Sequence, residues 1–124
     1  QNGIGKTSYP DGKKYLGEYK NGKENGYGEW SDLDGQTYKG EFKDGEFHGM
    51  GYCNLPDGGI YEGNFVDGRI EGEGEYKFPD GNVAKGIWKN NKPWDVIGTL
   101  ETGEVYGYFE QGIFRPVEKF IKPI

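Results

Sequence analysis

The stretch YEGNFVDG at residues 61–68 is nearly identical in pattern to two earlier stretches, YLGEYKNG at residues 15–22 and YKGEFKDG at residues 38–45. The copies lie 23 residues apart, and a fixed period of this length is typical of repeat proteins, whose units pack on their neighbours. In each copy a glycine stands midway between two aromatic residues. Because side chains alternate along a strand, these three positions share one face, and the stretch predicts a strand with aromatic rings on one side.

The period extends well beyond these three copies. The central glycine recurs at Gly17, Gly40, Gly63 and Gly86, and the following ring at Tyr19, Phe42, Phe65 and Trp88. Paired glycines follow at 26 and 28, 49 and 51, and 72 and 74, and turn sequences LDG, PDG and PDG end at Gly35, Gly58 and Gly81. One period earlier, Gly3, Gly5 and another PDG at residues 10–12 match the second half of a repeat.

Each repeat is predicted to form one β-hairpin. A helix is excluded because each interior glycine costs about 1 kcal/mol relative to alanine. The NG and DG pairs favour tight hairpin turns, and PDG places proline and glycine where a turn needs them. The first full unit predicts a strand, a turn at residues 20–25 (KNGKEN), a second strand over 26–31 and a turn at 33–35. The predicted fold is all-β: a single-layer antiparallel sheet of about five stacked hairpins.

The glycines explain how such a thin sheet could be packed. With no side chain at Gly17, Gly40 or Gly63, we expect the flanking rings to lean across the backbone. The paired glycines, such as Gly26 and Gly28, are expected to open space for rings on the neighbouring strand. The other face, with Leu16, Glu18 and Lys20 and with Lys39, Glu41 and Lys43, is predicted to be a solvated, charged face.

The expected organisation is a repeat array over residues 1–112 followed by a terminal segment. Its units are 1–14 (partial), 15–37, 38–60, 61–83, 84–104 (degenerate) and 105–112 (partial), and 113–124 is expected to be a C-terminal cap or linker. In the degenerate unit Ala84 replaces the tyrosine, and Asp95 and Ile97 stand where the paired glycines are expected. This unit is either an end cap, as terminal repeats often are, or a contact patch made of Trp88, Pro93, Trp94, Tyr106 and Tyr108.

Composition narrows the possible functions. The net charge is −6 and no long basic run occurs, which argues against nucleic-acid binding and a polybasic membrane patch. No apolar run approaches the roughly 20 residues that cross a bilayer. With one histidine (His48) and one cysteine (Cys53), a zinc site of nitrogen and sulfur ligands is not expected. Cys53 is either a small buried hydrophobe or a reactive thiol beside a groove. We therefore expect no cofactor, no metal and no catalytic activity.

The three units YLGEYKNGKENGYGEWSDLDG, YKGEFKDGEFHGMGYCNLPDG and YEGNFVDGRIEGEGEYKFPDG resemble MORN repeats, whose pattern is YxGxFxxGxxxGxGxxxxxDG. The resemblance, with partial units on both sides, runs from about Gly3 to Gly112. It implies a curved single-layer sheet of stacked hairpins. It also implies a scaffold, dimerisation or targeting module that is sometimes joined to a lipid kinase or a SET-type lysine methyltransferase. Nothing in residues 1–124 resembles those catalytic parts.

The resulting functional prediction is a cytoplasmic, non-catalytic scaffold that binds a protein or peptide through its aromatic face. Self-association as a homodimer is a further expectation. The alternatives are a phospholipid- or membrane-targeting module, a regulatory arm of a larger enzyme, and a ligand-binding aromatic repeat of the choline-binding kind. Association of the protein with a membrane or with the cytoskeleton is compatible with several of these functions. The predicted partner-binding residues, most of which are also expected to pack the core, are Tyr15, Tyr19, Trp30, Tyr38, Phe42, Tyr61, Phe65, Tyr76, Trp88 and Trp94.

Overall fold

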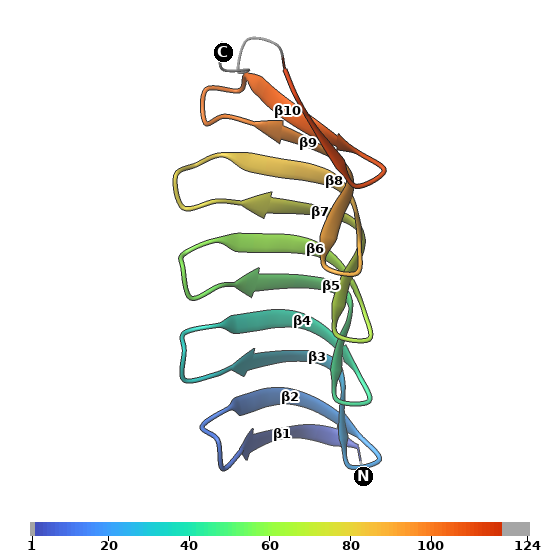
Figure 1. Ribbon diagram of the computed structural model, residues 1–124. Helices are drawn as coiled ribbons and strands as arrows, with labels where there is room; N and C mark the ends of the chain where they lie inside the picture. Colours follow the sequence, from blue (N-terminus) through green and yellow to red (C-terminus); the bar gives the residue numbers. More distant parts are fainter. Residues whose placement is uncertain (1, 118–124) are drawn as a thin grey trace.

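The computed structural model describes residues 2–117, which form one open antiparallel sheet of eleven strands in chain order (Figure 1). The strands are β1 (Gly3–Ser8), β2 (Lys14–Lys20), β3 (Lys23–Ser31), β4 (Thr37–Lys43), β5 (Glu46–Asn54), β6 (Ile60–Val66), β7 (Arg69–Lys77), β8 (Val83–Lys89), β9 (Lys92–Thr99), β10 (Val105–Glu110) and β11 (Ile113–Pro116). The described residues contain no helix. The predicted all-β strip of five hairpins is confirmed, with β1 as an additional edge strand.

Two-residue turns join the strands of each hairpin. Asn21 and Gly22 both have positive φ, 52° and 79°, and the turns after β4, β6, β8 and β10 share this geometry. Positive φ at both central residues is the mirror-image turn that suits the twist of a hairpin, and Asn, Asp and Gly tolerate it best. The predicted turn at residues 20–25 is therefore too long, because β3 already begins at Lys23.

Five-residue loops connect successive hairpins and lie along the opposite edge of the stack from these turns (Figure 1). In the first loop Gly12 has φ of 93°, and the Asp11 carboxylate accepts a hydrogen bond from the Lys13 N–H at 3.1 Å. That bond holds the pKa of Asp11 below its usual value. Asp57 accepts the Gly59 N–H in the same way at 2.8 Å. The turn chemistry predicted from PDG is confirmed, and its aspartate also closes the loop.

Four of the five hairpins, from β2–β3 to β8–β9, contain a bulge near the two-residue turn, whereas β10–β11 pairs in a regular register. Between β2 and β3, residues 25–27 lie opposite the single residue Glu18. Gly26 takes φ of 91°, and a Cβ there would meet the Glu18 carboxylate, which accepts the Tyr27 N–H. The equivalent Glu41 accepts the Met50 N–H at 2.8 Å. The prediction that Gly26 makes room for a ring is thus wrong, since it makes room for Glu18, which caps the bulge.

The inner face of the sheet is the face that carries the buried rings, and three rows of residues run along it. The tyrosine row contains Tyr15, Trp30, Tyr38, Cys53, Tyr61, Tyr76 and Ala84. The glycine row contains Gly17, Gly28, Gly40, Gly51, Gly63, Gly74 and Gly86. The third row, here called the ring row, contains Tyr19, Phe42, Phe65 and Trp88, which follow Gly17, Gly40, Gly63 and Gly86 by two residues on β2, β4, β6 and β8. Every residue of the ring row therefore lies on the same face of the sheet as the tyrosine row.

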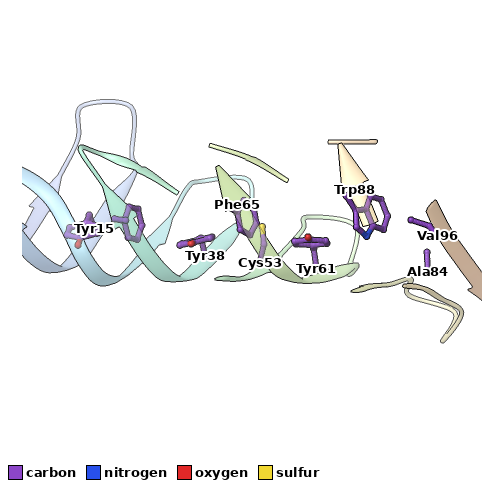
Figure 2. Packing of buried hydrophobic residues seen from close by; sticks show 9 residues of the cluster. Tyr15, Tyr38, Cys53, Tyr61, Phe65, Ala84, Trp88 and Val96 are labelled. Atoms are coloured by element: carbon purple, nitrogen blue, oxygen red, sulfur yellow. The ribbon is translucent and has the colours of Figure 1, made fainter. Parts of the chain in front are cut away.

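The tyrosines lie flat over the glycine row. A Cβ at Gly28 would lie 2.5 Å from the Tyr15 ring, and the Tyr15 hydroxyl donates to the Glu18 carbonyl at 2.8 Å. Tyr38 and Tyr61 repeat this arrangement, and Figure 2 shows the three tyrosines in sequence inside the curved strands. The expectation that rings lean across Gly17, Gly40 and Gly63 is confirmed.

The ring row joins these tyrosines into a continuous core. Phe42 lies edge-on between Tyr15 and Tyr38, with ring centroids 4.8 and 5.1 Å apart. Phe65 lies in the same way between Tyr38 and Tyr61, at 5.2 and 5.3 Å. Edge-to-face pairs contribute about 0.5–1.5 kcal/mol each beyond their buried area. The single-layer sheet therefore has a core that runs along its length.

The packing of a tyrosine ring over the glycines of its hairpin is here called the tyrosine lock. The fourth hairpin has a different pair of residues, Ala84 and Val96, in place of this lock. Its bulge contains one extra residue, Trp94, in place of the two extra residues found in β3, and this shift places Val96 opposite Gly86. Val96 is only 1% exposed and Ala84 only 6%, so valine fills the inner face where tyrosine is missing. The expectation that Asp95 and Ile97 occupy the paired-glycine positions is wrong, because both are exposed on the opposite face.

In the last hairpin the Tyr106 ring lies over Gly98 of the preceding strand β9, where a Cβ would be 2.6 Å from it, and Phe114 of β11 lies over Gly107. Of the segment expected to be a cap or linker, residues 113–116 form the edge strand β11, paired with β10. Proline is acceptable at such an edge because its missing N–H leaves no ladder bond unmade. The part of that segment at residues 118–124 lies outside the described residues.

Candidate functional site

The predicted partner-binding residues divide into a buried group and a half-buried group. Tyr15, Tyr38, Phe42, Tyr61, Phe65 and Trp88 are at most 6% exposed and form the core. Tyr19, Trp30, Tyr76 and Trp94 are half-buried on or beside the inner face. A partner bound to the inner face could therefore touch the second group directly, whereas the first group supports it from beneath.

The inner face forms a trough, because the curved strands enclose the core from both sides (Figure 2). A hollow of about 430 Å³ opens in it near the first two hairpins. One rim is the first five-residue loop, with Tyr9, Asp11 and Lys13, and the other holds the turn glycines Gly45 and Gly68. The floor and sides contain Glu24, Trp30, Phe42, Glu46 and Phe47. This volume is within the range of small ligand sites and can hold one or two side chains of a partner.

The rings of the hollow are held by packing against the core. Phe47 stacks on Tyr38 with ring centroids 3.9 Å apart, and Trp30 meets Phe47 edge-on at 5.3 Å. Tyr9 is fixed from the loop side, since its hydroxyl donates a hydrogen bond to the Glu24 carboxylate. The aromatic surface is therefore formed in advance of any binding event, and little side-chain entropy would be lost on contact.

The sequence analysis named Trp30 and Phe42 but missed the other residues of the hollow. Phe47 shares its repeat position with Glu24 and Ile70, so no aromatic column identified it. Tyr9 stands in a loop position occupied elsewhere by Asp32 and Leu55. A search for positions at which the repeats differ, instead of those at which they agree, could have found both residues.

Acidic groups predominate around the hollow. Asp11, Glu24 and Glu46 line it together with one cation, Lys13, whose ammonium lies 3.5 Å from the Asp11 carboxylate. Burial, the hydrogen bond to Glu24 and the charge of Glu24 together raise the pKa of Tyr9. The Tyr9 hydroxyl therefore keeps its proton, and can donate it to Glu24, beyond the pH at which a free tyrosine ionises.

Trp94, the second tryptophan of the half-buried group, already has a cation of the protein over its ring. The Lys89 ammonium lies 4.2 Å from the centroid of the Trp94 ring, and Trp94 also packs near the turn glycine Gly112. Tyr108, by contrast, pairs with Ile97 on the outer face. The proposed contact patch of Trp88, Pro93, Trp94, Tyr106 and Tyr108 is therefore not brought onto one surface.

The remaining candidate chemical groups are placed as follows. Cys53 is 5% exposed, and burial raises the pKa of its thiol, which favours the small buried hydrophobe over the reactive thiol. His48 lies in β5 just after Phe47, and its Nδ1 is buried without a hydrogen-bond partner. Among residues 2–117 no group of three or more metal-ligating side chains comes together. The same residues contain no helix that could span a membrane.

Comparison with known proteins agrees with this architecture. No curated protein matches the chain. The family model for the MORN repeat matches residues 15–37, 38–60 and 61–83, the three hairpin units in which tyrosines lie over glycines. MORN repeats are in general non-catalytic modules that interact with membranes or proteins. With consecutive matches over more than half its length and the hairpin strip that the repeat encodes, this chain belongs to the MORN-repeat family.

Proposed function

We propose that this chain is a non-catalytic interaction module that binds an extended peptide segment of a partner protein in its aromatic trough. The observation that carries the proposal is the hollow beside Trp30 and Phe47, where aromatic side chains remain accessible next to the closed core of Tyr38 and Phe42. Rigid aromatic surfaces supply contact area at low entropic cost, and such residues dominate the binding energy of many interfaces.

The shape of the trough favours an extended ligand. It runs between a rim of loops and a rim of turns, and its floor is a sheet of hairpins stacked side by side (Figure 1). A peptide lying in it could place successive side chains against Trp30 and then against Tyr76 farther along the same row. Grooves that accept extended peptides in this way derive specificity from a few side-chain pockets.

The substitutions used to test this function must leave the buried core residues unchanged. Alanine at Tyr38 or Tyr61 would unfold the sheet, since these rings are 0% and 1% exposed. Trp30→Thr is suitable because threonine already occurs at the equivalent position of β1, where Thr7 pairs with Tyr15 as Trp30 does from the other side. The matched control is Tyr27→Thr, which removes a ring that is 58% exposed on the outer face.

A random peptide library displayed on phage is panned against the immobilised chain, and the selected peptides are synthesised and measured by fluorescence anisotropy. We expect Trp30→Thr to weaken binding at least tenfold and Tyr27→Thr to leave it unchanged, with both variants folded by circular dichroism. Selected peptides that bind wild type and Trp30→Thr equally, or a panning that enriches no peptide, would contradict the proposal.

A second candidate function, binding of anionic lipid, is favoured by one feature of the outer face. A hollow of about 640 Å³ there is lined by Lys6, Lys14 and Lys39 together with hydroxyl side chains, although Lys39 is paired with Glu29 at 3.4 Å. Flotation with vesicles that contain a phosphoinositide tests it. This candidate requires flotation that Lys6→Gln plus Lys14→Gln abolishes, and it is excluded if the wild-type chain stays with the unbound fraction at low salt.

A further inference from the structure

The hollow beside Trp30 combines two features that together select a class of ligand. Its walls are aromatic, with Tyr9, Trp30 and Phe47 facing the open space, and its margin is acidic. A basic side chain is complementary to both features, because its aliphatic stem packs on rings while its charged end reaches carboxylates. A neutral apolar side chain would match only the rings, and an acidic one would be repelled.

The protein itself neutralises only part of the negative charge around the hollow. Of its three carboxylates, Asp11 is paired with Lys13, and Glu24 accepts a bond from the uncharged Tyr9 hydroxyl. Glu46 is exposed at the start of β5, and within residues 2–117 it has no recorded ion pair. Two of the three negative charges thus remain uncompensated, and the chain as a whole carries a net charge of −6.

The molecule also shows the expected contact at its other end. Lys89 places its ammonium over the Trp94 ring at 4.2 Å, which is the one cation–π contact recorded among residues 2–117. Trp30 is likewise half-buried, but in the described part of the chain its ring carries no cation. Trp30 thus lines the hollow that contains the acidic groups without a cation of this protein over its ring in the described residues.

From these observations we propose that the hollow formed by Tyr9, Trp30, Phe47, Glu24 and Glu46 recognises an arginine or lysine side chain of the bound peptide. The ammonium or guanidinium group lies over Trp30 and within reach of Glu46 and Glu24, and its stem lies against Phe47. This assignment rests on the proposed function, since it names the chemistry of the peptide that the trough binds.

The selected peptides provide the test. We expect basic residues to be enriched at one position, and each peptide is remade with citrulline in place of arginine or norleucine in place of lysine, which keep the aliphatic stem and remove the charge. The replacement should weaken binding to the wild-type chain by about tenfold, as expected for a loss of about 1.4 kcal/mol. Added salt should weaken the basic peptide more than its citrulline form.

Variants of the protein separate the charge from the rings. Glu46→Gln should reduce the affinity for the basic peptide severalfold and leave the citrulline form unaffected, whereas Glu62→Gln, an exposed position on β6, should change neither. Glu46 is exposed and outside the core, so this variant should fold even if Trp30→Thr does not.

The possible failures can be told apart. Peptides that lose affinity for Trp30→Thr but bind equally well with citrulline would overturn the basic-ligand assignment and leave the peptide-binding function standing. Peptides that bind the wild type and Trp30→Thr equally, or a panning that yields no peptides, would overturn both.

Discussion

At the scale of single residues, the fold depends on a ring that occupies the place of two missing side chains. Tyr38 lies across Gly40 on its own strand and Gly51 on the next, and its hydroxyl donates to the Glu41 carbonyl at 2.8 Å. A methyl group on Gly51 would lie 2.4 Å from the Tyr38 ring, well inside van der Waals contact. Because Tyr38 is fully buried, the ring has nowhere to move without displacing Phe47.

We therefore predict that Gly51→Ala destabilises the protein by about 1–3 kcal/mol, the usual cost of overpacking a core. Gly5→Ala on the edge strand β1 is the matched control. A Cβ there would be 3.1 Å from Tyr19, which is half-buried and can adjust, so the cost should stay below about 1 kcal/mol. Urea unfolding followed by tryptophan fluorescence measures both values. Equal costs for the two variants would show that the tyrosine lock is not tight.

The buried tyrosines also make a prediction about alkaline pH. Burial raises the pKa of Tyr15 and of Tyr61 from the ordinary value of 10.0 to about 12, and it raises the pKa of Tyr38 as well. A tyrosine whose pKa is raised by folding binds its proton more tightly in the native state. Its contribution to stability is complete below the unfolded pKa of about 10 and is lost as pH rises through the folded value near 12.

We expect the urea midpoint to show no tyrosine-dependent change between about pH 7 and 9 and to fall steadily above pH 10. Tyr61→Phe should make that fall shallower, because it removes one titrating group. The variant should be nearly as stable as wild type at pH 7, since the Tyr61 hydroxyl makes only a long bond of 3.4 Å to the Asn64 carbonyl. A midpoint that declines with the same slope in both proteins would refute this.

At the scale of elements, the fourth hairpin shows how the array tolerates a broken repeat. Ala84 leaves the inner face without a tyrosine, and the shorter bulge in β9 turns Val96 into the vacated space. Two changes that would each damage the hairpin thus compensate for each other. Such compensation predicts energetic coupling between the two positions.

Restoring only the tyrosine at position 84 or only the glycine at position 96 should therefore destabilise the protein, and restoring both should not. Val96→Gly should cost about 2–4 kcal/mol through lost burial, and Ala84→Tyr about 1–3 kcal/mol through crowding against Val96. We expect the double variant to recover at least about 2 kcal/mol relative to the sum of the single effects. The control combines Ala84→Tyr with Ile97→Gly, which is 53% exposed on the other face, and its effects should add. Additivity in both cycles would rule out the compensation.

The hairpin β2–β3 shows what the sequence could and could not predict. The tyrosine lock was predictable because Tyr15, Gly17 and Gly28 recur at fixed spacing, and steric complementarity between a ring and a missing side chain follows directly. The bulge was not, because strict alternation places Gly26 and Gly28 on one face, whereas the bulge gives Gly26 a φ of 91°, which directs its Cβ position toward Glu18. The hollow near Trp30 was only partly predicted, because it depends on positions where the repeats differ.

At the scale of the whole molecule, stability is a sum of similar contacts between neighbours. Each strand makes its main contacts with the strands before and after it in the sequence, and the hairpins β2–β3, β4–β5 and β6–β7 present the same rows to their neighbours. Contacts of this kind make the array modular, as in other repeat proteins. Removal of a complete repeat should leave the remaining interfaces intact, provided that the alternation of faces is preserved.

Deletion of residues 41–63 tests this modularity. It removes 23 residues, one full period, and joins Gly40 to Asn64, so the new strand reads YKGNF with both rings on the inner face. We expect a folded protein with native-like strand content by circular dichroism. The slope of its unfolding free energy against urea concentration should be smaller, roughly in proportion to its length. Deletion of residues 41–62, which leaves one glycine more, gives YKGGNF and turns Phe65 and the rest of its strand outward. That variant should be strongly destabilised or aggregate, because the core would lose Phe65, which is normally 4% exposed. If the two deletions proved equally stable, the register of rings and glycines along the strip would not be what holds this protein together.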